Sequence, residues 1–235
     1  MIKRVLIIKN ISYEEPGLIL EVLNKTHISY EILDFSEKLS NPNLEEYDLL
    51  IIMGGPDSAN DKSAKIIKEL NIINSAFKKN IPIFGICLGL QLMVKAIDGI
   101  VYRNSVEEIG FKRNKDWYRV KLTNLGLKDP IFKDIKEEFI VFQLHGETVE
   151  LNDNIELLGI GKYCRNQIIK IANFNYGFQF HFELTPDLLK DWIELAPELR
   201  NYNTNQFFRD FEEIMEDYLK RGKKIFKNYL EIWND

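Results

Sequence analysis

Short apolar runs alternate with amphipathic helical patterns over the first hundred residues of the chain. Runs bounded by glycine, proline or charged residues predict strands at 5–8, 28–35, 49–53 and 81–86. Apolar positions three and four residues apart predict helices that begin at Pro16, extend around 66–73, and cover 88–97. Continuous apolar strands separated by helices are typical of a parallel sheet that is covered on both faces. We therefore predict a doubly wound open sheet.

The second half of the chain has a different pattern. Five runs joined by short turns predict strands that add to the sheet in antiparallel fashion: 117–122, 139–145, 155–163, 167–174 and 177–183. From Thr185-Pro186 onward the pattern is helical. An apolar stripe there indicates either core packing or a dimer seam, and its members are Phe207, Phe211, Ile214 and Tyr218. We expect one domain over 1–195 and a helical C-terminal extension over 196–235 packed on it.

The composition excludes several classes of protein. The chain has 31 Lys and Arg against 36 Asp and Glu, a net charge of −5, which argues against a general nucleic-acid binder. Two cysteines cannot form a disulfide framework and three histidines lack zinc-site spacing, so we expect no metal. No apolar stretch reaches the ~20 residues of a membrane span. The N-terminal apolar stretch ends at Lys9, too early for a signal peptide, and a cytoplasmic protein is expected.

A cysteine stands where a predicted strand runs directly into a helix, in the segment Gly85-Ile86-Cys87-Leu88-Gly89. A strand–turn–helix with small neighbours is typical of a nucleophile elbow. The helix dipole and the free N–H groups at a helix N-terminus favour the thiolate form of Cys87. The alternative is an unreactive buried cysteine, beside glycines that only permit close packing. Cys164 lacks this context and is predicted to be structural.

Two His-x-Glu motifs offer a proton-transfer group with a carboxylate to orient it: His145-Gly146-Glu147 and His181-Phe182-Glu183. Residues i and i+2 of a strand share a face, so the spacing does not separate the two motifs. The run 178–183 reads as continuous strand, whereas Gly146 interrupts the other run, which favours His181. A structural role is the alternative for either histidine.

Two glycines follow the predicted strand at 49–53, in the segment Gly54-Gly55-Pro56-Asp57-Ser58. Glycines at the end of a strand let backbone N–H groups approach a ligand, as in an oxyanion hole or a phosphate cradle. The segment also imitates the Ser-Gly-Gly-x-Asp-Ser loop of ATP pyrophosphatases, with Met53 in place of the first serine. A plain turn is the third alternative. The sequence contains no Walker A pattern.

Together these segments resemble the class I (triad-type) glutamine amidotransferases, in the stand-alone branch similar to the amidotransferase domain of GMP synthase. The resemblance covers about residues 45–190, and rests on segments 54–56, 85–91, 108–110, 145–147 and 179–183. It implies an open, doubly wound, mostly parallel sheet of the flavodoxin-like type. Phe182 stands where the family usually has proline between His and Glu, and proline would fix the backbone there.

The resemblance also implies roles for individual residues. Cys87 would be the nucleophile, His181 the general base and acid, and Glu183 the carboxylate that orients His181. His145 would have a structural role or line the pocket. Five further residues are implied as oxyanion donors or substrate contacts: Gly55, Leu88, Gln91, Gly146 and Glu147.

The implied reaction is hydrolysis of the glutamine side-chain amide to glutamate and ammonia through a γ-glutamyl thioester, without a cofactor. No synthetase motif is recognised, so ammonia would pass to a synthetase subunit in trans. No nucleic-acid or membrane partner is expected, and a homodimer remains an open alternative. Two other functions also stay open. One is a stand-alone hydrolase of γ-glutamyl peptides or amides without an ammonia acceptor, and the other is a regulatory glutamine-binding protein.

Overall fold

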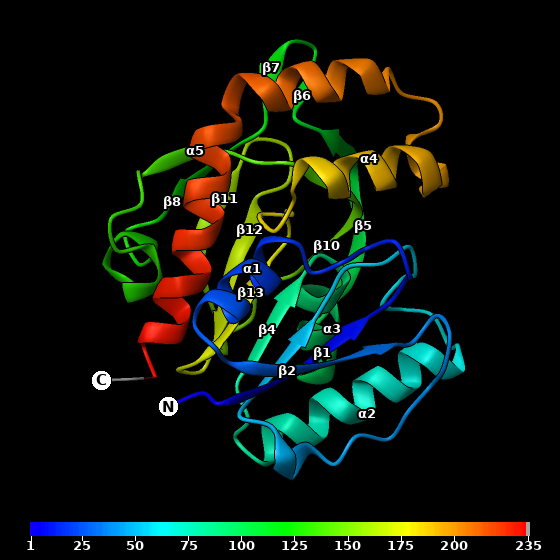
Figure 1. Cartoon of the computed structure of the whole chain (residues 1–235), viewed down its shortest axis with the longest axis vertical. Helices are drawn as coiled ribbons and strands as arrows, with labels where there is room; N and C mark the ends of the chain where they lie inside the picture. Colours follow the sequence, from blue (N-terminus) through cyan, green and yellow to red (C-terminus); the bar gives the residue numbers. More distant parts are fainter. Residues whose placement is uncertain (234–235) are drawn as a thin grey trace.

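The computed structural model describes residues 1–233, and a nine-stranded sheet forms its centre (Figure 1). One half of the sheet is parallel, in the order β2-β1-β3-β4. Its strands are β1 (Arg4–Lys9), β2 (Ser29–Asp34), β3 (Leu49–Ile52) and β4 (Ile83–Ile86). This order and direction are those of a flavodoxin-like sheet, and confirm the α/β fold predicted for the first hundred residues.

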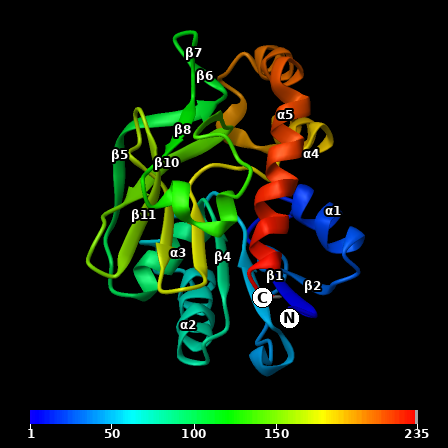
Figure 2. The same ribbon diagram turned by 90° about the vertical axis from the view of Figure 1, so that its left-hand side faces the viewer.

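Helices cover both faces of the parallel half (Figure 2). Alternate strand residues point to opposite faces. Val5 and Ile7 of β1 pack in a cluster with α1 (Leu18–Lys25) and the C-terminal half of α5, whereas Leu6 and Ile8 pack with α2 (Ala64–Lys78) and α3 (Leu88–Ala96). Every residue of β3 and β4 is fully buried. These strands are therefore apolar at every position, which is why they read as continuous runs in the sequence.

The second half of the sheet is largely antiparallel, as predicted. Strand β13 (Asn175–Phe178) lies parallel to β4, and the following strands alternate in direction. They are β12 (Asn166–Ile171), β11 (Ile155–Gly161), β8 (Arg119–Leu122) and β9 (Glu138–Ile140).

Two short ribbons lie outside the main sheet. Strand β5 (Val101–Gly110), which the sequence pattern did not predict, pairs with β10 (Gln143–Val149), with a bulge between His145 and Glu147. Strands β6 (Lys112–Arg113) and β7 (Asp116–Trp117) form a hairpin. The predicted single strand 139–145 was wrong, because residues 141–142 leave the main sheet and β10 starts a new pairing.

The predicted strand 177–183 was also wrong in its second half. Strand β13 ends at Phe178, opposite Ile86 of β4, and the chain turns into α3 directly after Ile86. Because β4 stops there, the segment after Phe178 has no parallel neighbour on that side. His181 and Glu183 therefore lie beyond the strand, and Gly146 lies within one.

Two helices follow the last strand: α4 (Pro186–Leu195) and α5 (Thr204–Glu231). Phe207, Phe211 and Tyr218 of α5 are buried in a cluster with Phe111 and Trp192, so core packing explains the apolar stripe and no dimer seam is needed to cover it. The proposed boundary at residue 195 stays a prediction. Within residues 1–233, no helix combines the length and apolarity needed to cross a membrane.

Candidate active site

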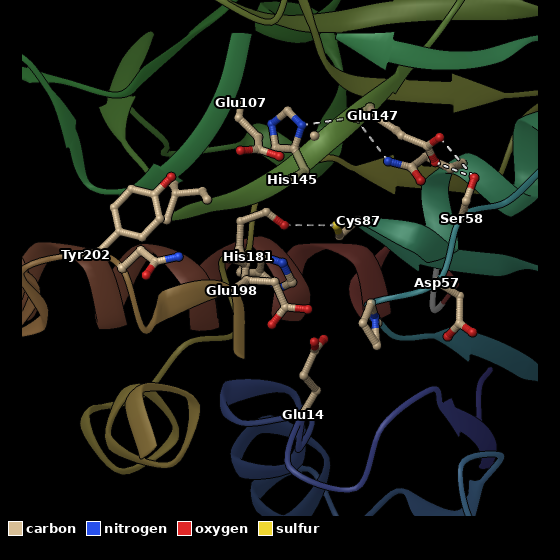
Figure 3. Close-up of a pocket in the computed structure, with 17 residues that line it drawn as sticks. Glu14, Asp57, Ser58, Cys87, Glu107, His145, Glu147, His181, Glu198 and Tyr202 are labelled. Atoms are coloured by element: carbon tan, nitrogen blue, oxygen red, sulfur yellow. Dashed lines mark hydrogen bonds between the residues drawn. The ribbon is translucent and has the colours of Figure 1, made fainter. Parts of the chain in front are cut away.

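A cavity of about 680 Å³ lies where the parallel strands end. Its walls include Glu14 from the loop after β1, Gly55 from the loop after β3, and Cys87 directly after β4. Ligands of open α/β sheets bind in the crevice outside the carboxyl ends of the strands. Ten of the residues around this cavity are labelled in Figure 3.

Cys87 has the backbone of a nucleophile elbow. It precedes the first residue of α3 and has φ 50° and ψ −106°, in a region that non-glycine residues rarely adopt. Leu88 is the first residue of α3, and the first N–H groups of a helix have no partner inside the helix. The sulfur of Cys87 lies 3.6 Å from the Leu144 carbonyl oxygen and 3.7 Å from Gln179 Nε2.

The glycines on either side of the elbow permit close packing. A Cβ atom on Gly85 would lie 2.7 Å from the backbone nitrogen of Leu90, and one on Gly89 would lie 2.2 Å from the carbonyl oxygen of Ile52. Only glycine lets α3 approach β3 and β4 so closely. Gly85 and Gly89 therefore do permit close packing, as the alternative interpretation held, and Cys87 between them has the strained backbone of an elbow as well.

His181 and Glu183 form a buried pair beside the elbow. His181 Nδ1 donates to Glu183 Oε1 at 2.7 Å, and the exposed fractions of the two residues are 1% and 0%. The other ring nitrogen, Nε2, has no hydrogen-bond partner within residues 1–233. Burial lowers the pKa of His181, but attraction to Glu183 and to the sulfur of Cys87 outweighs it, and the pKa lies well above the ordinary 6.5.

Helix α5 supports the turn that carries this pair. Tyr218 donates its hydroxyl hydrogen to the carbonyl oxygen of His181. A Cβ atom on Gly222 would lie 2.5 Å from the carbonyl oxygen of Phe182, so the helix backbone touches the turn. The Phe182 ring packs against Phe84 and Phe178, with centroids 5.7 and 5.1 Å apart. Packing thus anchors this turn where a proline ring is absent.

The glycine loop after β3 borders both the cysteine and the histidine. A Cβ atom on Gly54 would lie 2.9 Å from His181 Cε1 and 3.5 Å from the Cys87 Cβ. One on Gly55 would lie 2.5 Å from the Cβ of Asn10, whose side-chain amide donates to the Met53 carbonyl oxygen. The loop can approach the cavity so closely because both residues lack a side chain.

The predicted substrate contacts lie on one side of Cys87. Gln91 Nε2 donates to the Glu147 carbonyl oxygen at 3.2 Å. The Glu147 carboxylate accepts from the Ser58 hydroxyl, with distances of 2.9 and 2.8 Å to its two oxygens. Gly146 also lines the cavity. Six of the eight predicted site residues therefore line this cavity. The other two adjoin it: Glu183 is bonded to His181, and Leu88 follows Cys87 in the chain.

His145 is held by hydrogen bonds at both ring nitrogens. Nδ1 bonds the Glu147 carbonyl oxygen at 3.0 Å, and Nε2 bonds Glu108 Oε2 at 3.0 Å. Gln167 donates to the same Glu108 oxygen. Ligand atoms of Glu108, His145 and Cys164 lie within 4.8 Å of one another, although the sequence spacing indicated no metal site. Hydrogen bonds within the protein engage each of these three side chains, with Cys164 paired to Thr148.

The sequence analysis missed several side chains at the cavity, among them Glu14, Glu107, Glu198 and Tyr202. Glu14 follows β1, so the strand-end rule offered a signal for it. Glu107 lies on the unpredicted β5. Glu198 and Tyr202 come from the connection between α4 and α5, and nothing in the sequence pattern brings that connection to the cavity.

Comparisons with known proteins agree with this architecture. The family model "Glutamine amidotransferase class-I" matches residues 12–193. The glutamine amidotransferase-like protein YfeJ of Salmonella typhimurium is 29% identical over 193 residues, covering 79% of this chain and 78% of that protein. A glutamine-hydrolyzing GMP synthase subunit of Methanococcus vannielii is 32% identical over 155 residues, which are 63% of this chain and 73% of that protein.

A solved structure has nearly the same fold. The glutamine amidotransferase of Thermotoga maritima superimposes with a TM-score of 0.85 at 28% identity, over 97% of this chain and 98% of that one. Relatives named as whole GMP synthases are longer, and the match spans 26–31% of two of them. The matched family model covers most of the chain, and the resemblance stated from the motifs is confirmed: this chain belongs to the class-I glutamine amidotransferase family of enzymes.

Proposed function

We propose that this protein hydrolyses the side-chain amide of glutamine to glutamate and ammonia with Cys87, His181 and Glu183. The observation that carries the proposal is the state of the His181 ring. Nδ1 is bonded to Glu183, and within residues 1–233 Nε2 has no hydrogen-bond partner. Cys87 is close enough to raise the pKa of the ring. A nucleophile, a base with one free nitrogen and a carboxylate that orients the base are the three parts of a catalytic triad.

The reaction follows from these positions. The Cys87 thiolate attacks the amide carbon, and the developing oxyanion accepts hydrogen bonds from the N–H groups of Leu88 and Gly55. The C–N bond then breaks, and His181 Nε2 protonates the departing ammonia. The γ-glutamyl thioester remains on Cys87. His181 takes a proton from water, which attacks the thioester, and glutamate leaves as the thiol is restored.

Gln91, Gly146 and Glu147 form the end of the cavity that would hold the α-amino and α-carboxyl groups. The Glu147 carbonyl oxygen already accepts from Gln91 and from His145, which fixes the backbone at that point. The Glu147 carboxylate is oriented by Ser58 and would attract an α-ammonium group.

The ammonia released would pass to an acceptor site on a synthetase subunit in trans. Support comes from the Methanococcus relative, which is named as one subunit of a GMP synthase. We do not propose that this chain makes GMP by itself, because it matches only part of the longer GMP synthases.

Release of glutamate by the isolated protein tests the proposal. Glutamine and a γ-glutamyl dipeptide are offered separately, and Cys87→Ser serves as the blank. Glutamine turnover that is lost in Cys87→Ser is the expected result. Equal glutamate release from glutamine by the two proteins would overturn the proposal. Equal release from the dipeptide as well would leave a regulatory glutamine-binding protein as the remaining function.

A second candidate is a stand-alone hydrolase of γ-glutamyl amides or peptides. The cavity extends beyond Cys87 to Glu198, Asn201 and Tyr202, and its volume lies in the range of sites for ligands larger than one amino acid. Rapid, Cys87-dependent cleavage of the dipeptide with poor glutamine turnover would favour this function.

A further inference from the structure

The wall of the active-site cavity is acidic. Within residues 1–233, no lysine or arginine lines it, and its cationic candidates are two histidines. Five carboxylate side chains line it: Glu14, Asp57, Glu107, Glu147 and Glu198. Five carboxylates against two histidines give the wall an excess of negative charge, and such an excess raises the local concentration of positively charged ligands. The charge of this wall is therefore informative about the substrate.

Two of the five carboxylates are already engaged. Asp57 forms an ion pair with Lys65 at 2.5 Å, and Glu147 is bonded to Ser58. Glu14, Glu107 and Glu198 form no ion pair within residues 1–233. Figure 3 shows Glu198 on one side of Cys87 and Glu147 on the other. The cavity thus has two acidic ends. The α-ammonium group of the substrate would lie at the end with Glu147, and the second acidic end, with Glu14 and Glu198, lies on the other side of Cys87.

Glu14 is the strongest indication that the second end receives a ligand. Its exposed fraction is only 5%, yet its Oε2 has no hydrogen-bond partner within residues 1–233. A Cβ atom on Gly54 would lie 2.6 Å from that oxygen and 2.9 Å from His181 Cε1, so Glu14 and His181 flank the same glycine. A buried carboxylate without a donor is costly, and a bound ammonium group supplies the missing donor.

The position of His181 assigns this end to the leaving group. In the proposed reaction His181 Nε2 protonates the departing nitrogen, so the leaving amine must lie on the His181 side of the scissile bond. Glu14 borders His181. Burial chiefly raises the pKa of the Glu14 carboxyl to about 7, attraction to His181 opposes that rise, and repulsion from the nearby Glu198 adds to it. The exposed Tyr202 ring on the same side offers a face for a cation.

We propose that the preferred substrate is a γ-glutamyl amide whose leaving amine carries a second, positively charged amino group. This inference rests on the catalytic groups of the proposed function, and it names a substrate class for its second candidate, the stand-alone hydrolase of γ-glutamyl amides. Cys87 forms the thioester as the C–N bond breaks, and His181 gives its proton to the departing nitrogen. Water then hydrolyses the thioester. The products are glutamate and a diamine, and no redox partner takes part.

Three substrates test the proposal. They are the γ-glutamyl amides of 1,4-diaminobutane, of n-pentylamine and of 4-aminobutyrate, whose leaving amines end in an ammonium, a methyl and a carboxylate group. The expected kcat/KM is about 10-fold higher for the ammonium compound than for the methyl compound, equal to about 1.4 kcal/mol. The carboxylate compound is expected to be the poorest. The preference should shrink in 0.5 M salt because screening weakens it.

Glu198→Gln removes one charge from the second acidic end. The ratio of kcat/KM for the ammonium and methyl compounds should fall about 3-fold or more in this variant. Glu14→Gln, at the buried carboxylate, should lower the same ratio. Glu194→Gln is the matched control, because Glu194 is exposed on α4 and does not line the cavity, and it should keep the wild-type ratio. Because the two kcat/KM values are measured on the same variant, a general loss of activity cancels in their ratio.

The outcomes separate this inference from the proposed function. Cys87-dependent hydrolysis at equal rates for the ammonium and methyl compounds would overturn the inference and leave the triad standing. A preference for the carboxylate compound would also overturn it. Absence of any Cys87-dependent hydrolysis, glutamine included, would instead overturn the proposed function itself.

Discussion

Two His-x-Glu motifs with identical spacing border the same cavity, and they are built differently. In His181-Phe182-Glu183 the two ends of the motif bond each other at 2.7 Å. In His145-Gly146-Glu147 the carboxylate turns to Ser58, and the His145 ring bonds Glu108 from another strand. Among the residues that the structure describes, His181 has one ring nitrogen without a hydrogen-bond partner, and both ring nitrogens of His145 have partners.

The backbone explains the difference. Residues i and i+2 of an extended strand share a face, but stand about two rises, ~6–7 Å, apart. His145 and Glu147 lie on β10, where a bulge also changes the register. His181 and Glu183 lie past the end of β13, and residues 182–183 form a turn that brings the side chains together. The hydrogen bond between His181 and Glu183 depends on this turn, because a continuous strand would hold the two side chains too far apart.

The largest expected effect distinguishes the two histidines. His181→Ala should lower kcat by about 10³–10⁴-fold, because it removes the group that transfers protons. Steady-state glutaminase assays measure this, and circular dichroism checks that the fold is retained. His27→Asn is the control, since His27 is exposed and asparagine tolerates its φ of 56°. A larger loss in His145→Ala than in His181→Ala would reverse our assignment.

His145→Ala should act mainly on stability. Breaking a buried pair leaves the Glu108 carboxylate, 1% exposed, without one of its donors, and such losses cost about 3–5 kcal/mol. Urea unfolding measures the change. The double variant His145→Ala with Glu108→Gln should recover part of it, because the amide carries no charge. If His145→Ala has the same free energy of unfolding as wild type, the hydrogen bond between His145 and Glu108 does not stabilise the fold.

Glu183→Gln should lower kcat by about 10²-fold, less than His181→Ala, because it disturbs the orientation of the ring and leaves the base in place. It also removes the main attraction that raises the pKa of His181, while burial, which lowers that pKa, remains. NMR titration of the His181 ring should therefore show a lower pKa in the variant. An unchanged pKa of His181 in the variant would show that Glu183 does not raise it.

The same pair affects stability with pH. Because the pKa of His181 is raised in the folded protein, its stabilising contribution is complete below about pH 6.5 and is lost as the pH rises through the folded-state pKa. The free energy of unfolding of wild type should thus fall relative to Glu183→Gln as the pH rises above 6.5. Urea unfolding at pH 6 and pH 9 measures the difference.

The smallest effect is expected at Ser58. Ser58→Ala removes both hydrogen bonds to the Glu147 carboxylate and should raise KM for glutamine a few-fold with little change in kcat, since the reacting atoms are not touched. A loss mainly in kcat would mean that Ser58 acts on the chemistry and not on substrate binding.

Several features could be predicted because local pattern decides them. Strands β1, β3 and β4 were found since they are continuous apolar runs, and β2 was found since apolar and polar residues alternate along it. Cys87 was found since a strand joins a helix there without a loop. The interruption in the run 139–145 was missed, because buried residues on either side of residue 142 belong to different sheets. Hydrophobicity alone does not say which neighbour a strand has.

The argument from strand continuity that favoured His181 over His145 was wrong. The sequence suggested that His181 continues a strand and that Gly146 ends one, and the structure has the opposite arrangement. The resemblance to a known family pointed to the same histidine on other grounds. The free Nε2 of His181 and the two engaged nitrogens of His145 now support that choice physically.

The sequence by itself determined the parallel half of the sheet, the elbow at Cys87 and the list of groups able to do chemistry, because burial periodicity and glycine placement are local properties. Only the tertiary structure decided which carboxylate each histidine bonds, and that Glu14 and Glu198 share the cavity. His145 and Glu108 are far apart in the chain, and so are Glu14 and Glu198. Their meeting, and the turn that joins His181 to Glu183, depend on where β4 ends and on how α4 and α5 pack over the sheet. Such contacts follow from packing of the whole domain and leave no periodic signal in the chain.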